Sequence, residues 1–453
     1  MCCLVATKWL PMGRSILYSE GHALPAVGKH TTRSYYPLTS YDLAKLLARR
    51  PEIASFVQEL VLSSRYRSVV PMPARDSRWG DFLANEVIYR EVEAIITAGA
   101  MRRSRVALHL FAYVGLISLA CDMLIGRFSN VSTSLTSLKV DHVGFLLLLL
   151  RHLRMDSEAF ARVRTVSLLV DAQAIQDAAL EHDVPNGYVS AACASLPQLR
   201  HLTIETPPQD PLAAMSDPTA VEQAWNPSHR LDHLDSLTLL GGVSPLHYLV
   251  LQGTLRTIKT FNLSLHERLQ DTWPLSAHIV ESFVRVVDHV GAPHLSSFTI
   301  ETLANLRGQS IFLETIELSC EALATFLSRL PALIHVRMMG DRTFLQHAYA
   351  TLPPTLKELT LAINKESFIQ SQTRDNQLAN SLIYWIRDRQ DRHAPLLKTL
   401  VYGVYWPPMR HMPAGVFSHE QVASYYVDYL AGQCEAKKIS FVPLTPGAAE
   451  MCS

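Results

Sequence analysis

A short apolar motif recurs along this chain, and it limits the possible folds more than any other feature of the sequence. Its clearest copy is Leu-Pro-Gln-Leu-Arg-His-Leu-Thr-Ile at Leu196–Ile204, where we expect a helix to end before Pro197 and a short strand to follow. Related copies begin at Leu231, Pro293, Leu330 and Pro354. A pattern that returns in this way predicts a solenoid, in which each unit buries its apolar face against its neighbours.

Strands and helices are expected to alternate along most of the chain. A first strand is predicted at Gln58–Leu62, and later strands are centred on Leu138, Val166, Leu202, Leu237, Phe261, Phe298, Val336, Leu359, Leu400 and Ile439. Helices are predicted at Ala277–Val290, Glu321–Leu330, Leu378–Arg389 and Glu420–Leu430. The first of these should bury Ile279, Phe283, Val286, Val287 and Val290 and end at Gly291. This alternation predicts a parallel sheet, because a crossover helix returns the chain to the same edge.

The strand pattern distinguishes between two parallel architectures. A doubly wound sheet, covered by helices on both faces, needs strands that are nearly continuous apolar runs. Here the strands alternate instead, as in Leu202-Thr203-Ile204 and Leu237-Thr238-Leu239, so that one face is apolar and the other polar. We therefore predict an α/β fold, an irregular leucine-rich-repeat-like solenoid with parallel strands on its concave face and helices on its convex face.

The repeat units are irregular in length. Strand centres from Val166 to Phe298 are spaced by 36, 35, 24 and 37 residues, whereas regular leucine-rich repeats run about 20–29 residues. Long insertions are therefore expected, the largest being a proline-rich loop at Thr206–Ser228. A further apolar stretch, Val106–Cys121, falls short of the roughly 20 residues that a membrane span needs, and we interpret it as a buried helix and strand.

Composition narrows the partners and the compartment. Of the 453 residues 48% are hydrophobic, and the formal net charge is zero, so there is no general electrostatic attraction to nucleic acid or to an anionic membrane. The seven cysteines are scattered and form no Cys-x-x-Cys pair, which is typical of reduced thiols. Together with a first segment unlike a secretory signal, this predicts an intracellular protein, cytoplasmic or nuclear.

Two N-terminal segments carry a family resemblance. Leu4–Tyr18, within a helix predicted at Leu4–Glu20, resembles the closing helix of the F-box in fungal F-box/leucine-rich-repeat proteins, where a Trp and then a Leu-Tyr pair end the box. Tyr41–Leu62 resembles the helix, Pro-Glu turn and first repeat strand that follow. The chain departs from the family because no Leu-Pro-x-Glu-Ile-Leu-like helix precedes Leu4.

The resemblance implies a function and a domain plan. The protein would be a substrate receptor of an SCF-type ubiquitin ligase, joined to a Skp-type adaptor through a remnant box that includes Trp9, Leu10, Leu17 and Tyr18. Residues 1–40 would form that remnant and a linker, residues 41–445 the solenoid, and residues 446–453 a flexible tail. Two alternatives remain: a helix that packs on the first repeat, and a stand-alone recognition module without any ligase link.

Motifs of catalysis and cofactor binding are missing from the sequence. It contains no glycine-rich phosphate loop, no dinucleotide-binding fingerprint, no Gly-x-Ser-x-Gly elbow and no His-Glu-x-x-His. We therefore expect no cofactor, no metal site and no enzyme activity. An α/β enzyme with dispersed catalytic residues stays open as a less favoured alternative, because such sites are defined by geometry and not by sequence spacing.

The polar residues of the alternating strands form the candidate binding site. Because side chains alternate along a strand, the neighbours of the apolar residues should share one open surface. We predict that a protein client binds on the concave face, at His201, Thr203, Glu205, Ser236, Thr238, Thr260, Asn262, Ser297, Thr299, Glu301, His335, Arg337, Glu358 and Thr360. A broad, shallow and polar surface of this kind suits a protein segment better than a small molecule.

Overall fold

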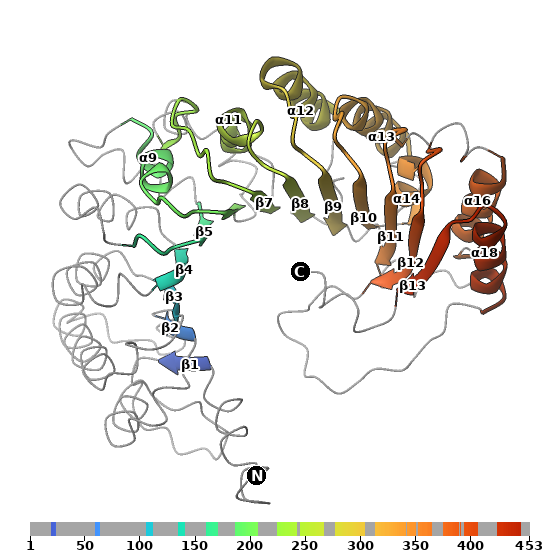
Figure 1. The fold of residues 1–453 in the computed structure, drawn as a ribbon, viewed down its shortest axis with the longest axis horizontal. Coiled ribbons are helices and arrows are strands. Elements are labelled where there is room, and N and C mark those ends of the chain that lie inside the picture. Colours follow the sequence, from blue (N-terminus) through green and yellow to red (C-terminus); the bar gives the residue numbers. More distant parts are fainter. Residues whose placement is uncertain are drawn as a thin grey trace, which may run out of the picture. The chain divides into compact units, whose positions relative to one another are not determined.

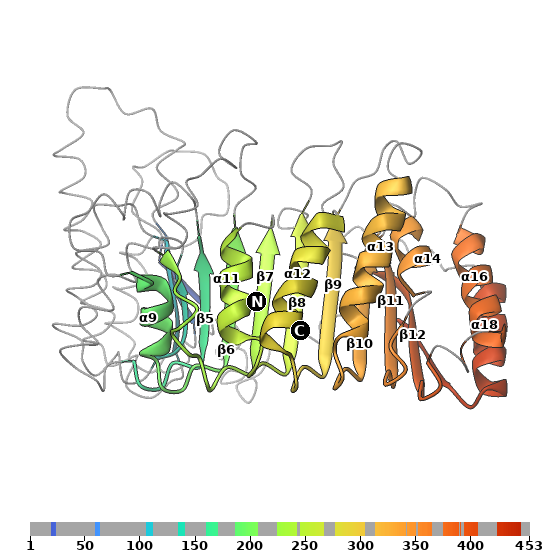
Figure 2. The same ribbon diagram turned by 90° about the horizontal axis from the view of Figure 1, so that it is seen from above.

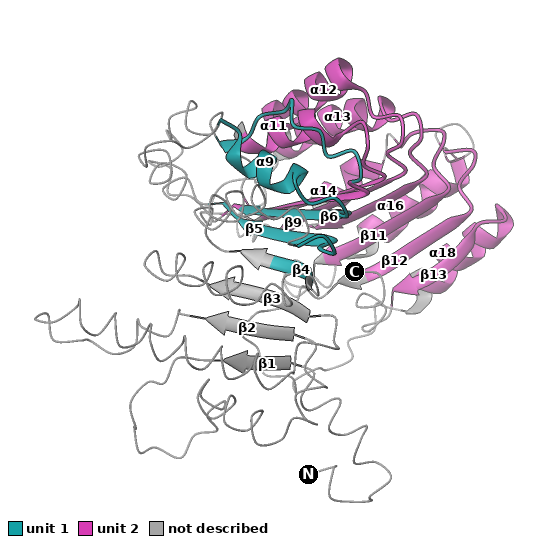
Figure 3. Ribbon diagram, turned by 60° about the vertical axis from the view of Figure 1, so that its left-hand side comes forward, with its two compact units in different colours: residues 1–205, 216–233 teal, residues 206–215, 234–453 magenta. Residues whose placement is uncertain are grey.

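A computed structural model gives the fold of the chain (Figure 1, Figure 2). It describes residues 20–23, 59–63, 106–111, 135–140, 160–170, 186–206, 224–241, 245–266, 277–303, 313–340, 342–349, 352–364, 375–388, 390, 394–405 and 424–444. The chain divides into two compact units (Figure 3). Unit 1 comprises residues 1–205 and 216–233, and unit 2 comprises residues 206–215 and 234–453.

Unit 1 is built from parallel strands that follow one another in chain order. They are β1 (Glu20–Ala23), β2 (Glu59–Ser63), β3 (Val106–Phe111), β4 (Leu135–Val140), β5 (Thr165–Leu169) and β6 (His201–Thr206), the last residue of β6 being counted with unit 2. Helix α9 (Tyr188–Ala194) precedes β6 and ends before Pro197, as the motif predicts. The predicted strand centres Leu138, Val166 and Leu202 are register partners.

Three features of unit 1 differ from the sequence prediction or extend it. Strand β1 was not predicted: Glu20, expected as the last residue of a helix, is the first residue of a strand, and the rest of that predicted helix lies outside the described residues. Strand β3 accounts for the start of the apolar stretch at Val106, whose remainder is also outside them. Among the helices that the structure describes, none combines the length and the apolar character needed to cross a membrane.

Unit 2 is also built from parallel strands in chain order, and most of the helices between them are described. Its parallel strands are β7 (Ser236–Gly241), β8 (Thr260–His266), β9 (Ser297–Leu303), β10 (His335–Gly340), β11 (Glu358–Asn364), β12 (Thr399–Tyr405) and β13 (Ser440–Leu444). Its helices are α11 (Pro245–Thr254), α12 (Ala277–Val290), α13 (Leu313–Ser328), α14 (Arg342–Ala348), α16 (Asp375–Asp388) and α18 (Ser424–Ala436).

The described helices of unit 2 form a single layer on one side of the strands. Figure 1 shows them along the outer side of the unit, with the strands along its inner side, and Figure 2 shows the helices side by side in chain order. A doubly wound sheet would carry helices on both faces. The fold is therefore an α/β leucine-rich-repeat-like solenoid, which confirms the prediction made from the alternating strands.

The register of unit 2 matches the predicted strand centres, with one exception. The aligned row of inward-facing residues is Leu237, Phe261, Phe298, Val336, Leu359, Leu400 and Phe441. The sequence placed the last centre at Ile439, two residues too early. Ile439 instead closes helix α18: Lys438 adopts the left-handed conformation, with φ 60°, and the Ile439 N–H donates to the Cys434 carbonyl at 2.8 Å.

The helices were predicted less accurately than the strands. The bounds of α12 are as predicted, and Gly291 ends it in the left-handed conformation, with φ 77°. Val280, which was not predicted as inward-facing, is buried, whereas Ile279 and Val290 are only half-buried. Helix α13 begins at Leu313, eight residues earlier than predicted. Helix α18 is displaced toward the C-terminus, and the short helices α11 and α14 were missed.

A repeated hydrogen-bond pattern sets the register at the start of each strand. The Asp235 carbonyl accepts from the N–H groups of both Lys259 and Thr260, at 2.8 and 3.1 Å, and the Lys259 carbonyl accepts from Ser296 and Ser297, at 2.9 and 3.0 Å. The same arrangement recurs at Ser296, Ile334 and Lys357 in unit 2, and at Arg164 in unit 1. The strands joined in this way are thus aligned at their first residues, so insertions elsewhere in these repeats leave the register unchanged.

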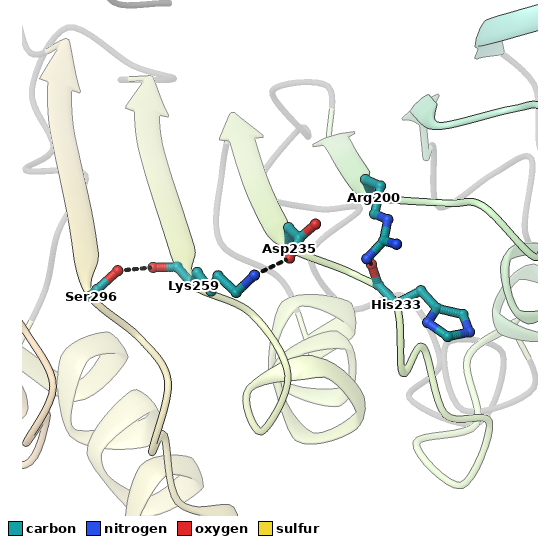
Figure 4. A network of polar contacts seen from close by, with 5 residues as sticks. All are labelled: Arg200, His233, Asp235, Lys259 and Ser296. Atoms are coloured by element: carbon teal, nitrogen blue, oxygen red, sulfur yellow. Dashed lines mark hydrogen bonds and ion pairs between the residues drawn. The ribbon is translucent and has the colours of Figure 1, made fainter.

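Side chains add to this pattern at the same edge (Figure 4). In unit 2 the Lys259 Nζ lies 2.8 Å from Asp235 Oδ1, and the Ser296 hydroxyl donates to the Lys259 carbonyl at 3.3 Å. In unit 1 the Arg200 guanidinium donates to the His233 carbonyl at 3.2 Å. The Lys259–Asp235 pair is largely exposed, so it contributes at most about 1 kcal/mol to stability.

Candidate functional site

The strand face opposite the helices in unit 2 carries three parallel rows of side chains. The first row contains Ser236, Thr260, Ser297, His335, Glu358, Thr399 and Ser440. The middle row contains Thr238, Asn262, Thr299, Arg337, Thr360, Val401 and Val442. The third contains Leu240, Ser264, Glu301, Met339, Ala362, Gly403 and Leu444. We call these three rows the polar strand face.

The structure brings the predicted binding residues of unit 2 together in these rows. Most of them are half-buried, and they alternate with fully buried neighbours, as the two-residue period of a strand requires. Thr360 differs, because its side chain is buried, at 7% exposed. The polar character fades toward β12 and β13, where Val401, Gly403 and Val442 replace polar residues.

The predicted residues of unit 1 lie on β6. His201 is exposed, and Thr203 and Glu205 are half-buried. Their register partners on β5 are Thr165, Ser167 and Leu169, respectively. The sequence prediction missed Thr165 and Ser167, although both alternate with the buried residues of β5 in the pattern that identified the other strands.

Polar contacts between neighbouring strands orient several side chains of the polar strand face. The Asn262 amide donates to the Thr238 hydroxyl at 3.2 Å, and the Ser264 hydroxyl donates to Glu301 Oε2 at 2.8 Å. His335 Nδ1 lies 3.3 Å from Glu358 Oε2, with the two side chains 44% and 43% exposed. Sequence reasoning did not find Ser264. Its position two residues after Asn262, and therefore on the same face of the strand, was the signal that could have identified it.

Arg337 lies at the centre of the middle row of the polar strand face. Its register partners are Thr299 on β9 and Thr360 on β11. Its Nε is buried and has no hydrogen-bond partner within the described part of the chain. Of the two carboxylates on adjacent strands, Glu301 accepts from Ser264 and Glu358 faces His335.

A serine–histidine contact in unit 1 was the strongest candidate for an enzyme site. Ser190 Oγ lies 2.8 Å from His229 Nδ1, donates to the Gly187 carbonyl at 2.8 Å and accepts from the Asn226 N–H at 3.0 Å. Ser190 is fully buried, at 0% exposed, so a substrate cannot reach its hydroxyl. The contact instead anchors the end of the large insertion to helix α9.

The three described cysteines are also unsuited to act as nucleophiles. Burial raises the pKa of the Cys193, Cys320 and Cys434 thiols to about 12, so each remains protonated and poorly nucleophilic near neutral pH. Within the described ranges, no group of three or more His, Cys, Asp and Glu residues is placed to hold a metal ion. The predicted adaptor-binding residues Trp9, Leu10, Leu17 and Tyr18 lie outside the described residues.

Comparisons with known proteins include a solved structure that contains leucine-rich repeats. No protein-family model matches the chain, and no curated protein matches it in sequence. Among solved structures, it is similar to the leucine-rich-repeat-containing protein LegL7 from Legionella pneumophila, with 12% sequence identity and a TM-score of 0.40. The match covers 76% of this chain and 90% of that one.

Proposed function

We propose that this protein is a non-catalytic interaction scaffold that binds a protein client on its polar strand face. The observation that carries the proposal is the register of unit 2, which aligns polar side chains from successive strands in open rows on the face that its described helices leave uncovered. Seven strands about 4.8 Å apart, each about 20 Å long, give a face of roughly 700 Å². A standard protein interface buries about 800 Å² on each partner.

The chemistry of the face fits a protein partner. Hydroxyl and amide groups such as those of Thr238, Asn262 and Thr299 can donate or accept hydrogen bonds to a peptide backbone. Asn262 and Thr238 are held by a hydrogen bond between their strands, so these two side chains lose little freedom on binding. The face is broad, shallow and polar, whereas sites for small molecules are deep pockets that are mostly apolar.

The ligase link is the finer part of the proposal. It rests on the resemblance of the N-terminal segments to F-box/leucine-rich-repeat proteins. In this proposal residues 1–40, including Trp9, Leu10, Leu17 and Tyr18, contact a Skp-type adaptor, residues 41–445 form the client-binding solenoid, and residues 446–453 form a tail. Co-purification of the full-length chain with a Skp-type adaptor tests this link. If no adaptor binds, the protein acts as a stand-alone recognition module.

A matched pair of threonine substitutions tests the scaffold itself. Thr299→Arg places a long cation in the middle of the polar strand face, whereas Thr325→Arg places the same group on an exposed position of helix α13. We expect the first variant to lose client proteins in quantitative affinity capture from cells, and the second to retain them. If both variants capture the same proteins in the same amounts, the polar strand face is not the binding surface.

A further inference from the structure

Lysines gather at the edge of unit 2 where its last strands begin. The strands of the unit are parallel, so their first residues lie along one edge (Figure 2). Lys357 directly precedes β11 and Lys398 directly precedes β12, and both side chains are exposed. The Lys398 N–H donates to the Lys357 carbonyl at 2.8 Å, so the two lysines occupy neighbouring strand starts about 4.8 Å apart. Like charges placed side by side in this way repel each other.

A third lysine at this edge has a backbone conformation that favours glycine. Lys438 lies in the turn before β13, with φ 60°, and is exposed. Just after helix α12 the residue with this conformation is a glycine, Gly291, with φ 77°. Two residues after Lys438, the Ser440 N–H donates to the Lys398 carbonyl at 2.7 Å. The chain therefore keeps a cation next to the start of β13 where glycine would strain the backbone less.

The carboxylates near this edge do not neutralise the three lysines. Within the described part of the chain, none of the three makes an ion pair. Glu358 lies 3.3 Å from His335 Nδ1 instead, and Glu435 is exposed near the end of α18. Farther along the same edge, before β8, the Lys259 Nζ is paired with Asp235 at 2.8 Å (Figure 4). The unpaired positive charge is therefore concentrated at the starts of β11, β12 and β13.

One large apolar side chain is exposed beside these lysines. Leu396 lies two residues before Lys398 and is 51% exposed. At the same position before β8, β9, β10 and β11 the residues are polar or small, namely Thr257, His294, Ala332 and Thr355. The repeat itself therefore does not require a leucine there, and the exposed half of this side chain can contact a partner.

We propose that Lys357, Lys398, Lys438 and Leu396, which we call the lysine edge, bind an acidic protein segment. The lysines attract its carboxylates, and Leu396 contacts an apolar residue of the same segment. The chain as a whole has no net charge, whereas nucleic-acid-binding domains are strongly basic. A single exposed leucine also gives little apolar area for holding a membrane. The lysine edge contains no residue of the polar strand face, so this inference goes beyond the proposed function.

Peptide selection with counter-selection tests the inference. Random 12-residue peptides displayed on phage are selected on the full-length native chain and depleted on the double variant Lys357→Glu/Lys398→Glu. We expect the surviving peptides to share at least two aspartates or glutamates and an apolar residue. If no peptide survives, or if the survivors are not acidic, the lysine edge does not bind an acidic segment. Either result leaves the proposed function intact.

Affinities of one surviving peptide then measure the contribution of each lysine. Lys357→Glu and Lys398→Glu should each weaken binding at least about tenfold, equivalent to about 1.4 kcal/mol. Lys259→Glu is the matched control, because it makes the same charge change at the same register position of another strand. It should change affinity by less than about twofold, since exposed charges more than about 10 Å apart are largely screened. Equal losses in all three variants would assign the effect to general electrostatics and overturn the site.

Substitution of Lys438 separates binding from stability. Lys438→Gly should raise the urea concentration at the midpoint of unfolding, because glycine adopts the left-handed conformation without strain. The same variant should weaken peptide binding about threefold, a typical effect of one exposed ion pair. Lys438→Arg should retain the native affinity, because it keeps the charge. A Lys438→Gly variant that binds the peptide as tightly as the native chain would overturn the part of Lys438 in the site.

Other anionic partners are distinguished by direct titration. A single-stranded RNA and vesicles that contain phosphatidylserine are titrated against the native chain and Lys357→Glu. We expect both to bind more weakly than the selected peptide. Tighter binding of either one, lost in Lys357→Glu, would overturn the assignment to a protein segment. Urea unfolding of each variant establishes that it is folded before its binding is compared.

Discussion

Replacing Phe298 by leucine should destabilise unit 2 through the loss of two ring contacts. Phe298 is 1% exposed and lies in the inward-facing row of β9. Its ring centroid is 5.6 Å from that of Phe261 on β8 and 5.4 Å from that of Phe326 on α13, both tilted. Phe298 therefore joins the previous strand to the helix that follows its own strand.

The magnitude follows from what leucine retains. Leucine keeps most of the buried apolar surface, so the hydrophobic contribution changes little. Two aromatic contacts at about 0.5–1.5 kcal/mol each are lost. A residual cavity of about 20 Å³ adds about 0.5 kcal/mol. The expected loss in the free energy of unfolding is therefore about 1.5–3.5 kcal/mol.

Urea unfolding at 25 °C, followed by circular dichroism, measures this loss. The pairwise part comes from a double-mutant cycle with Phe326→Leu, for which we expect a coupling of about 0.5–1.5 kcal/mol. Leu318→Ala, at a helix position that is 50% exposed, serves as a control and should change stability by less than about 0.5 kcal/mol. In a solenoid, where interactions are between neighbouring repeats, hydrogen exchange should increase most in β8, β9 and α13.

One result would refute this reasoning. If Phe298→Leu costs less than about 0.5 kcal/mol and its coupling to Phe326→Leu is zero within error, the rings do not form the contact described. A large loss with zero coupling would instead assign the effect to burial alone, and the magnitude argued from ring pairs would be wrong.

Three further predictions concern backbone conformation, thiols and surface charge. Gly241→Ala should cost about 2–4 kcal/mol in urea unfolding, because φ is 94° and the new methyl group would collide with the Thr206 carbonyl, whereas Gly432→Ala on α18, with open space around it, should stabilise by about 0.5–1 kcal/mol. The thiols of Cys193, Cys320 and Cys434 should resist alkylation in the native protein at pH 8 and react in urea, as peptide mass spectrometry can show. Because folding raises their pKa from 9.0 to about 12, stability should fall as pH rises from about 9 toward 12, where the unfolded chain releases protons that the native chain retains. Glu358→Gln should change stability by less than about 1 kcal/mol at pH 7, because its pairing with His335 is nearly half exposed.

Strand positions could be predicted because their signal is local. The alternation in Leu237-Thr238-Leu239 assigns each side chain to a face without knowledge of its neighbours in space. The copies of the motif then show that this assignment recurs, which is sufficient for a solenoid. The failure at Ile439 has a local cause as well, since Lys438 adopts a left-handed conformation in the turn after α18 and the strand begins only at Ser440.

Helix bounds were harder to predict because they depend on packing. Helix α13 extends back to Leu313 because Ile316 and Cys320, four residues apart, are both buried on its inner side. The insertion ending near Asn226 was predicted as a loop, yet its end is tied to α9 by Ser190. Neither contact can be inferred from the residues next to it in sequence.

The sequence by itself determined which residues of each strand face inward and that the strands must be parallel. Only the tertiary structure decided which polar residues become neighbours: the Ser264 hydroxyl donates to Glu301 across 37 residues of sequence. The physical reason is that side-chain alternation is a property of one strand, whereas neighbours across strands depend on register. That register is set by the shared carbonyls at the strand starts and is independent of the length of the intervening insertions.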